Sequence, residues 1–222
     1  GVGYINGYII FAQRDNEGRL EERYRGYLPG GTVKWQWFGR GTGGPGLWLR
    51  HRKLEKDTKI LLLEGEWDVL TAYTRLSLHE AGWHISTWTA GASSSPTAND
   101  IPPSWRGREV HICYDNDVFQ GPDYKNYWIK DGSDQKVTNL RKNLLTKVAP
   151  TFVKAQCTVF IRQVAVHPKD IFGGDFRDWV DRGGTNLNDH TPWAFGDLPP
   201  LLVPLEELQF DELWDNNIGK SI

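Results

Sequence analysis

The sequence contains no methionine and only two cysteines, Cys113 and Cys157, in 222 residues. Two separated cysteines cannot supply the four thiolates of a zinc site built on cysteine alone. Because each lies in a strand-like apolar run, we expect core thiols in a reducing cytoplasm and no disulfide framework. The absence of methionine, including an initiator, and the start at Gly1 suggest a fragment of a longer chain or a processed product.

Long hydrophobic runs are also missing. No stretch approaches the roughly 20 apolar residues that cross a membrane, and no charged and then apolar leader is recognisable. We therefore expect a cytoplasmic globular protein with no membrane partner. The hydrophobic content of 39% is enough for a core, and the length suits one main domain with a smaller subdomain.

A strong net charge is the third absence. The formal charge of -2 argues against a uniformly basic nucleic-acid binder, but the charges are unevenly distributed. Residues 1–59 contain eleven Lys or Arg and six Asp or Glu, whereas residues 170–222 contain three and eleven. A surface that follows phosphates is therefore expected in the first part of the chain. The alternative is an ordinary solvated charged face.

The first part of the chain predicts a small antiparallel sheet. Three strand-like segments, over residues 7–13, 20–28 and 32–38, are separated by turn-forming residues. Trp35 and Trp37 share one face of the third segment, because side chains two apart in a strand point the same way. Aromatic rings interleaved with cations suit a groove for single-stranded nucleic acid, and packing within the protein is the alternative for the tryptophans. The candidate nucleic-acid or nucleotide ligands here are Arg23, Arg25, Lys34 and Arg40.

An acidic cluster in residues 64–68 directly follows a short apolar run. Residues 60–63 predict a buried parallel strand, and the carboxyl end of such a strand is a natural ligand site. Glu64 lies at that end. Glu66 and Asp68 then fall in the first turn of a helix predicted over residues 67–82, where carboxylates favour the helix dipole. We expect Glu66 to be a solvated cap.

Two further strands are predicted after this helix, over residues 83–88 and 109–114. The second is followed by Asp115 and Asp117, whose side chains point to one side if the backbone stays extended. Two converging carboxylates repel each other unless a cation lies between them, and Mg²⁺ prefers oxygen ligands of this kind. A turn or cap is the alternative for an isolated Asp-x-Asp. The position after a strand in the same sheet as Glu64 favours a metal site.

Together these motifs resemble the Toprim domain. Residues 64–68 have the sequence Glu-Gly-Glu-Trp-Asp, a loop containing glycine follows the second strand, and residues 114–117 have the sequence Tyr-Asp-Asn-Asp. The Toprim domain is shared by bacterial-type primases, type IA and type II topoisomerases, small nucleases and recombination proteins. The basic β segment in front is similar to the one that precedes Toprim in the RNA polymerase domain of bacterial primases and phage-type primase-helicases.

The resemblance implies an α/β fold, with a Rossmann-like parallel sheet, flanking helices and a small antiparallel β subdomain before them. We accordingly expect three parts. Residues 1–55 form a basic β-rich subdomain, residues 56–185 form the Toprim catalytic domain, and residues 186–222 form an acidic, proline-rich tail or linker.

The resemblance also implies roles for individual residues. Glu64 matches a glutamate that acts in acid/base chemistry or metal binding, and Asp115 and Asp117 match a metal-binding pair. Later, Lys169-Asp170 and residues 175–180 resemble a primase segment with a wider spacing than usual. Asp170 and Asp175 are therefore competing candidates for a further ligand. The implied catalytic residues are Glu64, Asp68, Asp115 and Asp117. The implied metal ligands are Glu64, Asp115, Asp117 and either Asp170 or Asp175. Lys169 is a candidate phosphate contact, and an ordinary surface lysine is the alternative.

The implied function is synthesis of short RNA primers on a single-stranded DNA template from NTPs, with Mg²⁺ or Mn²⁺, in a replication protein of a phage or mobile element. Because the sequence has no P-loop, we expect a replicative helicase, fused or separate, as a partner. Two alternatives stay open. The same carboxylates could serve a Toprim-type nuclease with water as the nucleophile, or the chain could be a non-catalytic nucleic-acid-binding module.

Overall fold

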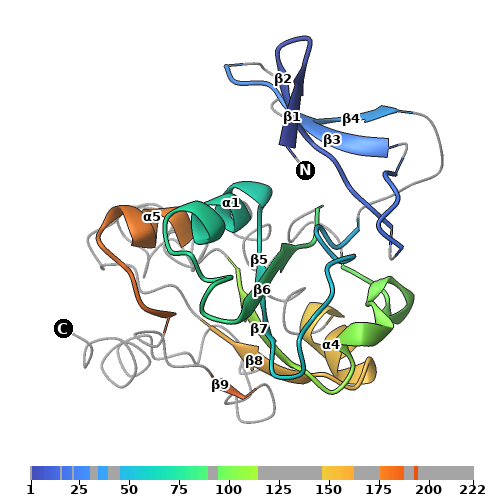
Figure 1. The fold of residues 1–222 in the computed structure, drawn as a ribbon, viewed down its shortest axis with the longest axis vertical. Helices are drawn as coiled ribbons and strands as arrows, with labels where there is room; N and C mark the ends of the chain where they lie inside the picture. Colours follow the sequence, from blue (N-terminus) through green and yellow to red (C-terminus); the bar gives the residue numbers. More distant parts are fainter. Residues whose placement is uncertain are drawn as a thin grey trace, which may run out of the picture.

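The computed structural model contains two β-sheets, one antiparallel and one mostly parallel, and its helices pack against the parallel sheet (Figure 1). The fold is therefore α/β, with a small antiparallel sheet in front, as the sequence predicts. The structure describes residues 2–15, 17–21, 23–30, 35–39, 46–89, 95–114, 147–162, 176–187 and 193–194.

The antiparallel sheet is formed from the first part of the chain. Three of its strands overlap the predicted segments, residues 7–13, 20–28 and 32–38, and each strand is shorter than its predicted segment. The first strand escapes prediction because residues 2–5 form a short edge strand whose side chains are all exposed. The four strands pair in sequence order: β1 (Val2–Ile5), β2 (Tyr8–Phe11), β3 (Arg23–Tyr27) and β4 (Trp35–Gly39).

The second sheet has five strands in the order β6-β5-β7-β8-β9, with only the last one antiparallel. Continuous apolar runs form its centre, since β5 and β7 are buried on both faces. The order matters for the site, because β7 lies directly beside β5. The strands are β5 (Lys59–Leu63), β6 (Trp83–Thr87), β7 (Glu109–Cys113), β8 (Thr158–Ile161) and β9 (Trp193–Ala194).

Helices cover both faces of the parallel sheet. The helices α1 (Glu66–Thr74) and α5 (Phe176–Asp181) lie side by side and share an apolar cluster with one face (Figure 1). On the other face, α4 (Ala149–Lys154) packs with the short 3-10 helices η2 (Ala98–Asp100) and η3 (Pro103–Trp105). No helix in the described part of the chain is long and apolar enough to span a membrane.

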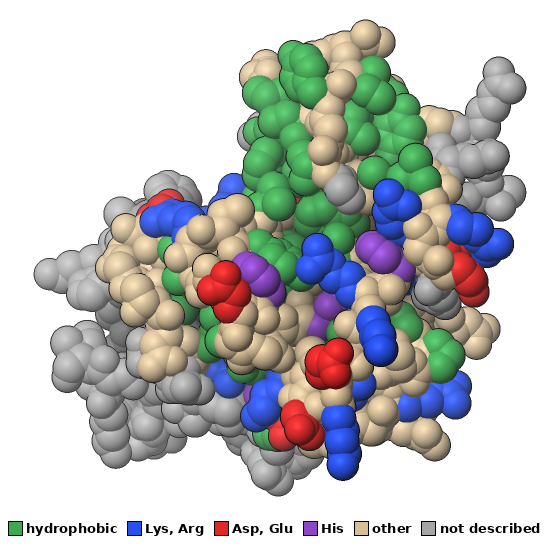
Figure 2. Space-filling model, viewed as in Figure 1, with side chains coloured by type: hydrophobic (Ala, Val, Ile, Leu, Met, Phe, Trp, Pro, Cys, Tyr) green, Lys and Arg blue, Asp and Glu red, His purple; other side chains and the backbone are tan. Residues whose placement is uncertain are grey.

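The antiparallel sheet packs onto α1 through aromatic side chains. Phe11 is fully buried. The centre of its ring lies 5.6 Å from the ring centre of Trp35, 5.6 Å from that of Trp48 and 5.2 Å from that of Trp67 in α1. Trp35 thus packs within the protein, which was the alternative interpretation for the tryptophans. The face drawn in Figure 2 is largely apolar over the antiparallel sheet, and Tyr4 of β1 is 72% exposed.

Candidate functional site

The candidate site lies at the carboxyl edge of the parallel sheet. In the register, Leu63 of β5 is paired with Thr87 of β6 on one side and with Cys113 of β7 on the other. Glu64 therefore leaves the sheet between the ends of two neighbouring strands. The Thr87 hydroxyl donates a hydrogen bond to the Glu64 carbonyl at 2.9 Å, which ties the end of β5 to the end of β6. Tyr114, the buried residue after β7, immediately precedes Asp115.

Glu66 is not a solvated cap, so this prediction is wrong. Its side chain is 1% exposed because the first turn of α1 faces the antiparallel sheet and not solvent. Arg25 Nη1 of β3 donates to both Glu66 carboxylate oxygens, at 3.2 and 3.3 Å. Burial raises the pKa of Glu66, and the charge of Arg25 acts in the opposite direction.

Arg25 is held by three neighbours. Besides Glu66, its guanidinium donates to the Thr89 carbonyl and lies 4.1 Å from the ring centre of Trp35. The side chain is 18% exposed. The interactions described for this candidate nucleic-acid ligand are thus made within the protein. In β3, Arg25 is paired with Trp37 of β4, so the residues predicted to alternate with the aromatics do lie beside them.

Asp68 is also buried, and it connects α1 to α5. Arg177 Nε of α5 donates to Asp68 Oδ1 at 3.1 Å, and the Asp68 side chain is 5% exposed. A Cβ at Gly65 would lie 3.2 Å from Asp68 Oδ2, so a larger residue there would shift this carboxylate slightly. Both acidic residues in the first turn of α1 are therefore paired with arginines from distant parts of the chain.

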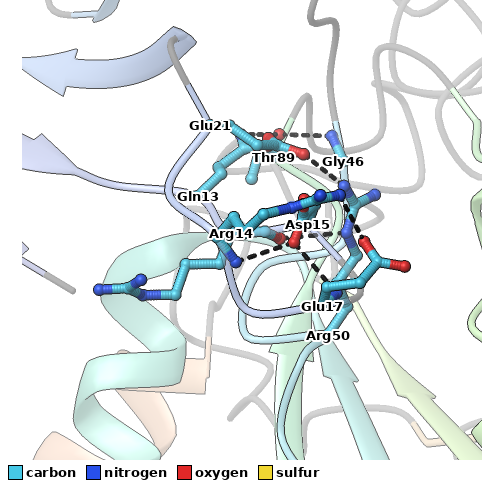
Figure 3. A network of polar contacts seen from close by, with 9 residues as sticks. Gln13, Arg14, Asp15, Glu17, Glu21, Gly46, Arg50 and Thr89 are labelled. Atoms are coloured by element: carbon cyan, nitrogen blue, oxygen red, sulfur yellow. Dashed lines mark hydrogen bonds and ion pairs between the residues drawn. The ribbon is translucent and has the colours of Figure 1, made fainter.

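A polar network around Thr89 joins the front of the chain to the segment after β6 (Figure 3). Gln13 Nε2 and the Gly46 backbone N–H both donate to Thr89 Oγ1 at 3.0 Å. The Thr89 N–H in turn donates to the Gly46 carbonyl at 3.1 Å. The sequence interpretation missed Gln13, which belongs to no motif, and it included Thr89 only as the start of the glycine-containing loop after the second strand. Their contact depends on the packing of the two sheets, which local patterns do not predict.

Only some of the predicted site residues lie in the described part of the chain. Glu64, Asp68 and Arg25 are described, whereas Arg23 is described only as a backbone position in β3. Within the described ranges, no three His, Cys, Asp or Glu side chains are grouped closely enough to hold a metal ion. The predicted residues outside the described part of the chain are Lys34, Arg40, Asp115, Asp117, Lys169, Asp170 and Asp175.

The sequence matches no protein-family model, and no curated protein matches it. Among solved structures, the chain is similar to the zinc-binding and RNA polymerase domains of the Aquifex aeolicus primase, with 17% identity and a TM-score of 0.51. That match covers 84% of this chain and 41% of the other. At this identity the similarity shows the fold alone, which is primase-like.

Two further solved structures are similar, with lower scores. The Escherichia coli primase catalytic core has 15% identity and a TM-score of 0.48, over 84% of this chain and 53% of that one. A complex of bacteriophage T7 lagging-strand DNA polymerase with the primase domains of two gp4 subunits, bound to an RNA/DNA hybrid and dTTP, has 14% identity and a TM-score of 0.46. This third match covers 86% of this chain and 83% of the other. The chain thus spans about two fifths and about half of the lengths of the first two.

Proposed function

We propose that the chain is the catalytic core of a DNA primase of the Toprim type, which makes short RNA primers on single-stranded DNA from NTPs. One observation carries the proposal. The register pairs Leu63 with Cys113, so the sequences that begin with Glu64 and with Tyr114-Asp115 follow neighbouring strands at one edge of the sheet. The primase-like fold, including the antiparallel sheet in front, supports the same function.

The proposed activity depends on Mg²⁺ or Mn²⁺, and the residue types at this edge suit such an ion, because hard divalent cations prefer carboxylate oxygens. Since Glu66 and Asp68 pair with arginines, we assign the metal role in the first motif to Glu64. When bound, the ion would bind the phosphates of the incoming nucleotide and offset the charge that develops on them. The proposed ligands are Glu64, Asp115, Asp117 and either Asp170 or Asp175.

The remaining side chains have binding or positioning roles in this proposal. Asp68 fixes α1 against α5 through Arg177, which keeps the turn after Glu64 in place.

The proposed partners are a single-stranded template, NTPs and a replicative helicase, fused or separate. The three proposed parts are residues 1–55, 56–185 and 186–222. The proposed contacts to phosphates of the template or nucleotide are Arg23, Lys34, Arg40 and Lys169.

The proposal is tested by giving the purified chain four NTPs, Mg²⁺ or Mn²⁺, and single-stranded DNA with and without a pre-annealed primer. We expect oligoribonucleotide products, and at least a hundredfold loss in Asp115→Asn and in Glu64→Gln. Asp57→Asn is the matched control, because Asp57 is an exposed carboxylate in the turn before β5 and should retain activity. No product from any template, primed or unprimed, would refute the proposal.

The same preparations separate the primase from the alternatives. Metal-dependent nicking of supercoiled plasmid that is lost in Asp115→Asn would indicate a nuclease. DNA binding that survives both Glu64→Gln and Asp115→Asn, with no turnover in either assay, would indicate a non-catalytic binding module.

A further inference from the structure

The first turn of α1 is the point where three parts of the chain meet. Glu66, two residues after Glu64, is buried against Arg25 of the antiparallel sheet. Arg25 reaches past Glu66 to the carbonyl of Thr89, in the segment that follows β6. One guanidinium therefore connects β3, the start of α1 and the segment after β6.

Arg25, Thr89 and the backbone of Glu64, two residues before Glu66, each make a further contact. The ring of Trp35 in β4 packs against Arg25, with its centre 4.1 Å from the guanidinium carbon. Thr89 is held through its hydroxyl by Gln13 and Gly46. The carbonyl of Glu64 is held by the Thr87 hydroxyl, two residues before Thr89. Arg25 thus contacts Glu66, two residues after Glu64, and Thr89, two residues after the threonine that holds the Glu64 carbonyl.

A buried ion pair by itself adds little to the stability of a fold, because removing both charges from water costs about as much free energy as their attraction provides. Its better attested effect is to specify one arrangement among several, since an unpaired charge left in the interior is strongly disfavoured. Here the arrangement specified is the placement of the antiparallel sheet over the carboxyl edge of the parallel sheet. The fork of donors on Arg25 suits this task, because it can serve Glu66 and the Thr89 carbonyl together.

We propose that Arg25 and Glu66 are positioning residues, which hold the end of β5, and with it Glu64, in a fixed place relative to the antiparallel sheet and the segment after β6. In this account Arg25 is not a ligand of the template or the nucleotide, and Glu66 is not a ligand of the metal ion. The inference rests on the proposed primase function for its effect on turnover, whereas the positioning itself is a property of the folded chain.

The kinetic test compares Arg25→Gln, Glu66→Gln and the double variant in primer extension on a primed template. We expect kcat to fall at least tenfold in each single variant, while KM for the NTP and Kd for single-stranded DNA change less than twofold. The double variant should lie within twofold of the poorer single variant, because both changes break the same interaction. Arg19→Gln is the control, since it removes an exposed arginine from the hairpin of the same sheet.

The opposite pattern overturns the inference. If Arg25 bound substrate, Arg25→Gln would raise KM or Kd at least tenfold while Glu66→Gln would not, and the two effects would multiply. Unchanged kcat in both folded single variants would overturn it equally. Arg25→Lys supplements the series if Arg25→Gln does not fold, because lysine keeps the charge but lacks the fork, and kcat should again fall without a change in KM.

Hydrogen exchange separates this inference from the proposed function. In both single variants we expect amides of residues 63–69 and 87–89 to exchange at least tenfold faster than in the wild type, with β8 unaffected. Exchange unchanged at these segments would refute the positioning role even if primer synthesis is observed. Faster exchange without any nucleotide incorporation by the wild type would support the positioning role and refute the primase.

Discussion

Two histidines of the parallel sheet are buried as neutral rings. His84 of β6 is 4% exposed, and its Nε2 has no hydrogen-bond partner among the described residues. Its ring packs edge to face against Trp105, with the two ring centres 5.5 Å apart. Burial lowers the pKa of His84 to about 3, and the charge of Arg52 adds to this effect. His111 of β7 accepts a hydrogen bond from Arg162 Nε at 3.0 Å, and burial lowers its pKa to about 4.

These histidines should make the fold sensitive to acid. Below pH of about 6.5 the unfolded chain protonates both rings, whereas the folded chain resists protonation until pH of about 4 or 3. The stability they contribute is therefore present above pH of about 6.5 and is lost as the pH falls toward 4. In His84→Phe, the ring contact with Trp105 is kept and the buried ring nitrogens are removed.

For His84→Phe we expect the free energy of unfolding at pH 7.5 to stay within about 1 kcal/mol of the wild type. Between pH 6.5 and 4.5, the variant should lose about 2 kcal/mol less stability than the wild type does. Urea unfolding at both pH values measures this difference. Equal losses in the two proteins would contradict the assignment of His84 as a buried neutral ring.

At the scale of elements, local patterns predict the strands better than the helices. The apolar run before Glu64 can only be a buried segment, and its shortness makes it a strand. The helix after it ends at Thr74 and not near Gly82, because Ser77 adopts a left-handed conformation, φ 47°, and the chain turns toward β6. The helix α4 (Ala149–Lys154) was not predicted.

The packing at the end of α5 depends on Gly184, because no side chain fits between its backbone and the ring of Trp179. A Cβ on Gly184 would lie 2.2 to 2.4 Å from ring atoms of Trp179, which is buried in the cluster beneath α1 and α5. We expect Gly184→Ala to displace that ring and to cost about 1 to 3 kcal/mol in the free energy of unfolding. Gly3→Ala is the control, because nothing lies within 4 Å of the added carbon. A loss below about 0.5 kcal/mol in Gly184→Ala, measured by urea unfolding, would contradict the close packing.

At the scale of the whole molecule, the site is defined by how the two sheets meet. The sequence could predict that Glu64 ends a strand, because that follows from a short apolar run. It could not predict that Glu66 is buried, because its partner Arg25 lies 41 positions away in another sheet. Strand order is equally hidden from local patterns, and the structure places β7 directly beside β5, so the strands that precede the two acidic sequences end at the same edge. The strands that lead to this edge were therefore predictable, whereas the contact between Glu66 and Arg25 was not.

We propose that this site joins ribonucleotides under the direction of a template. The most direct measurement is single-nucleotide extension of a primer annealed to single-stranded DNA, with Mg²⁺ or Mn²⁺ and each of the four NTPs in turn. We predict that the NTP complementary to the template base is added at least a hundredfold faster than the others. The preference should follow the template base when that base is changed, and addition should be lost in Asp115→Asn. Addition of no nucleotide, or addition that ignores the template base, would contradict the account.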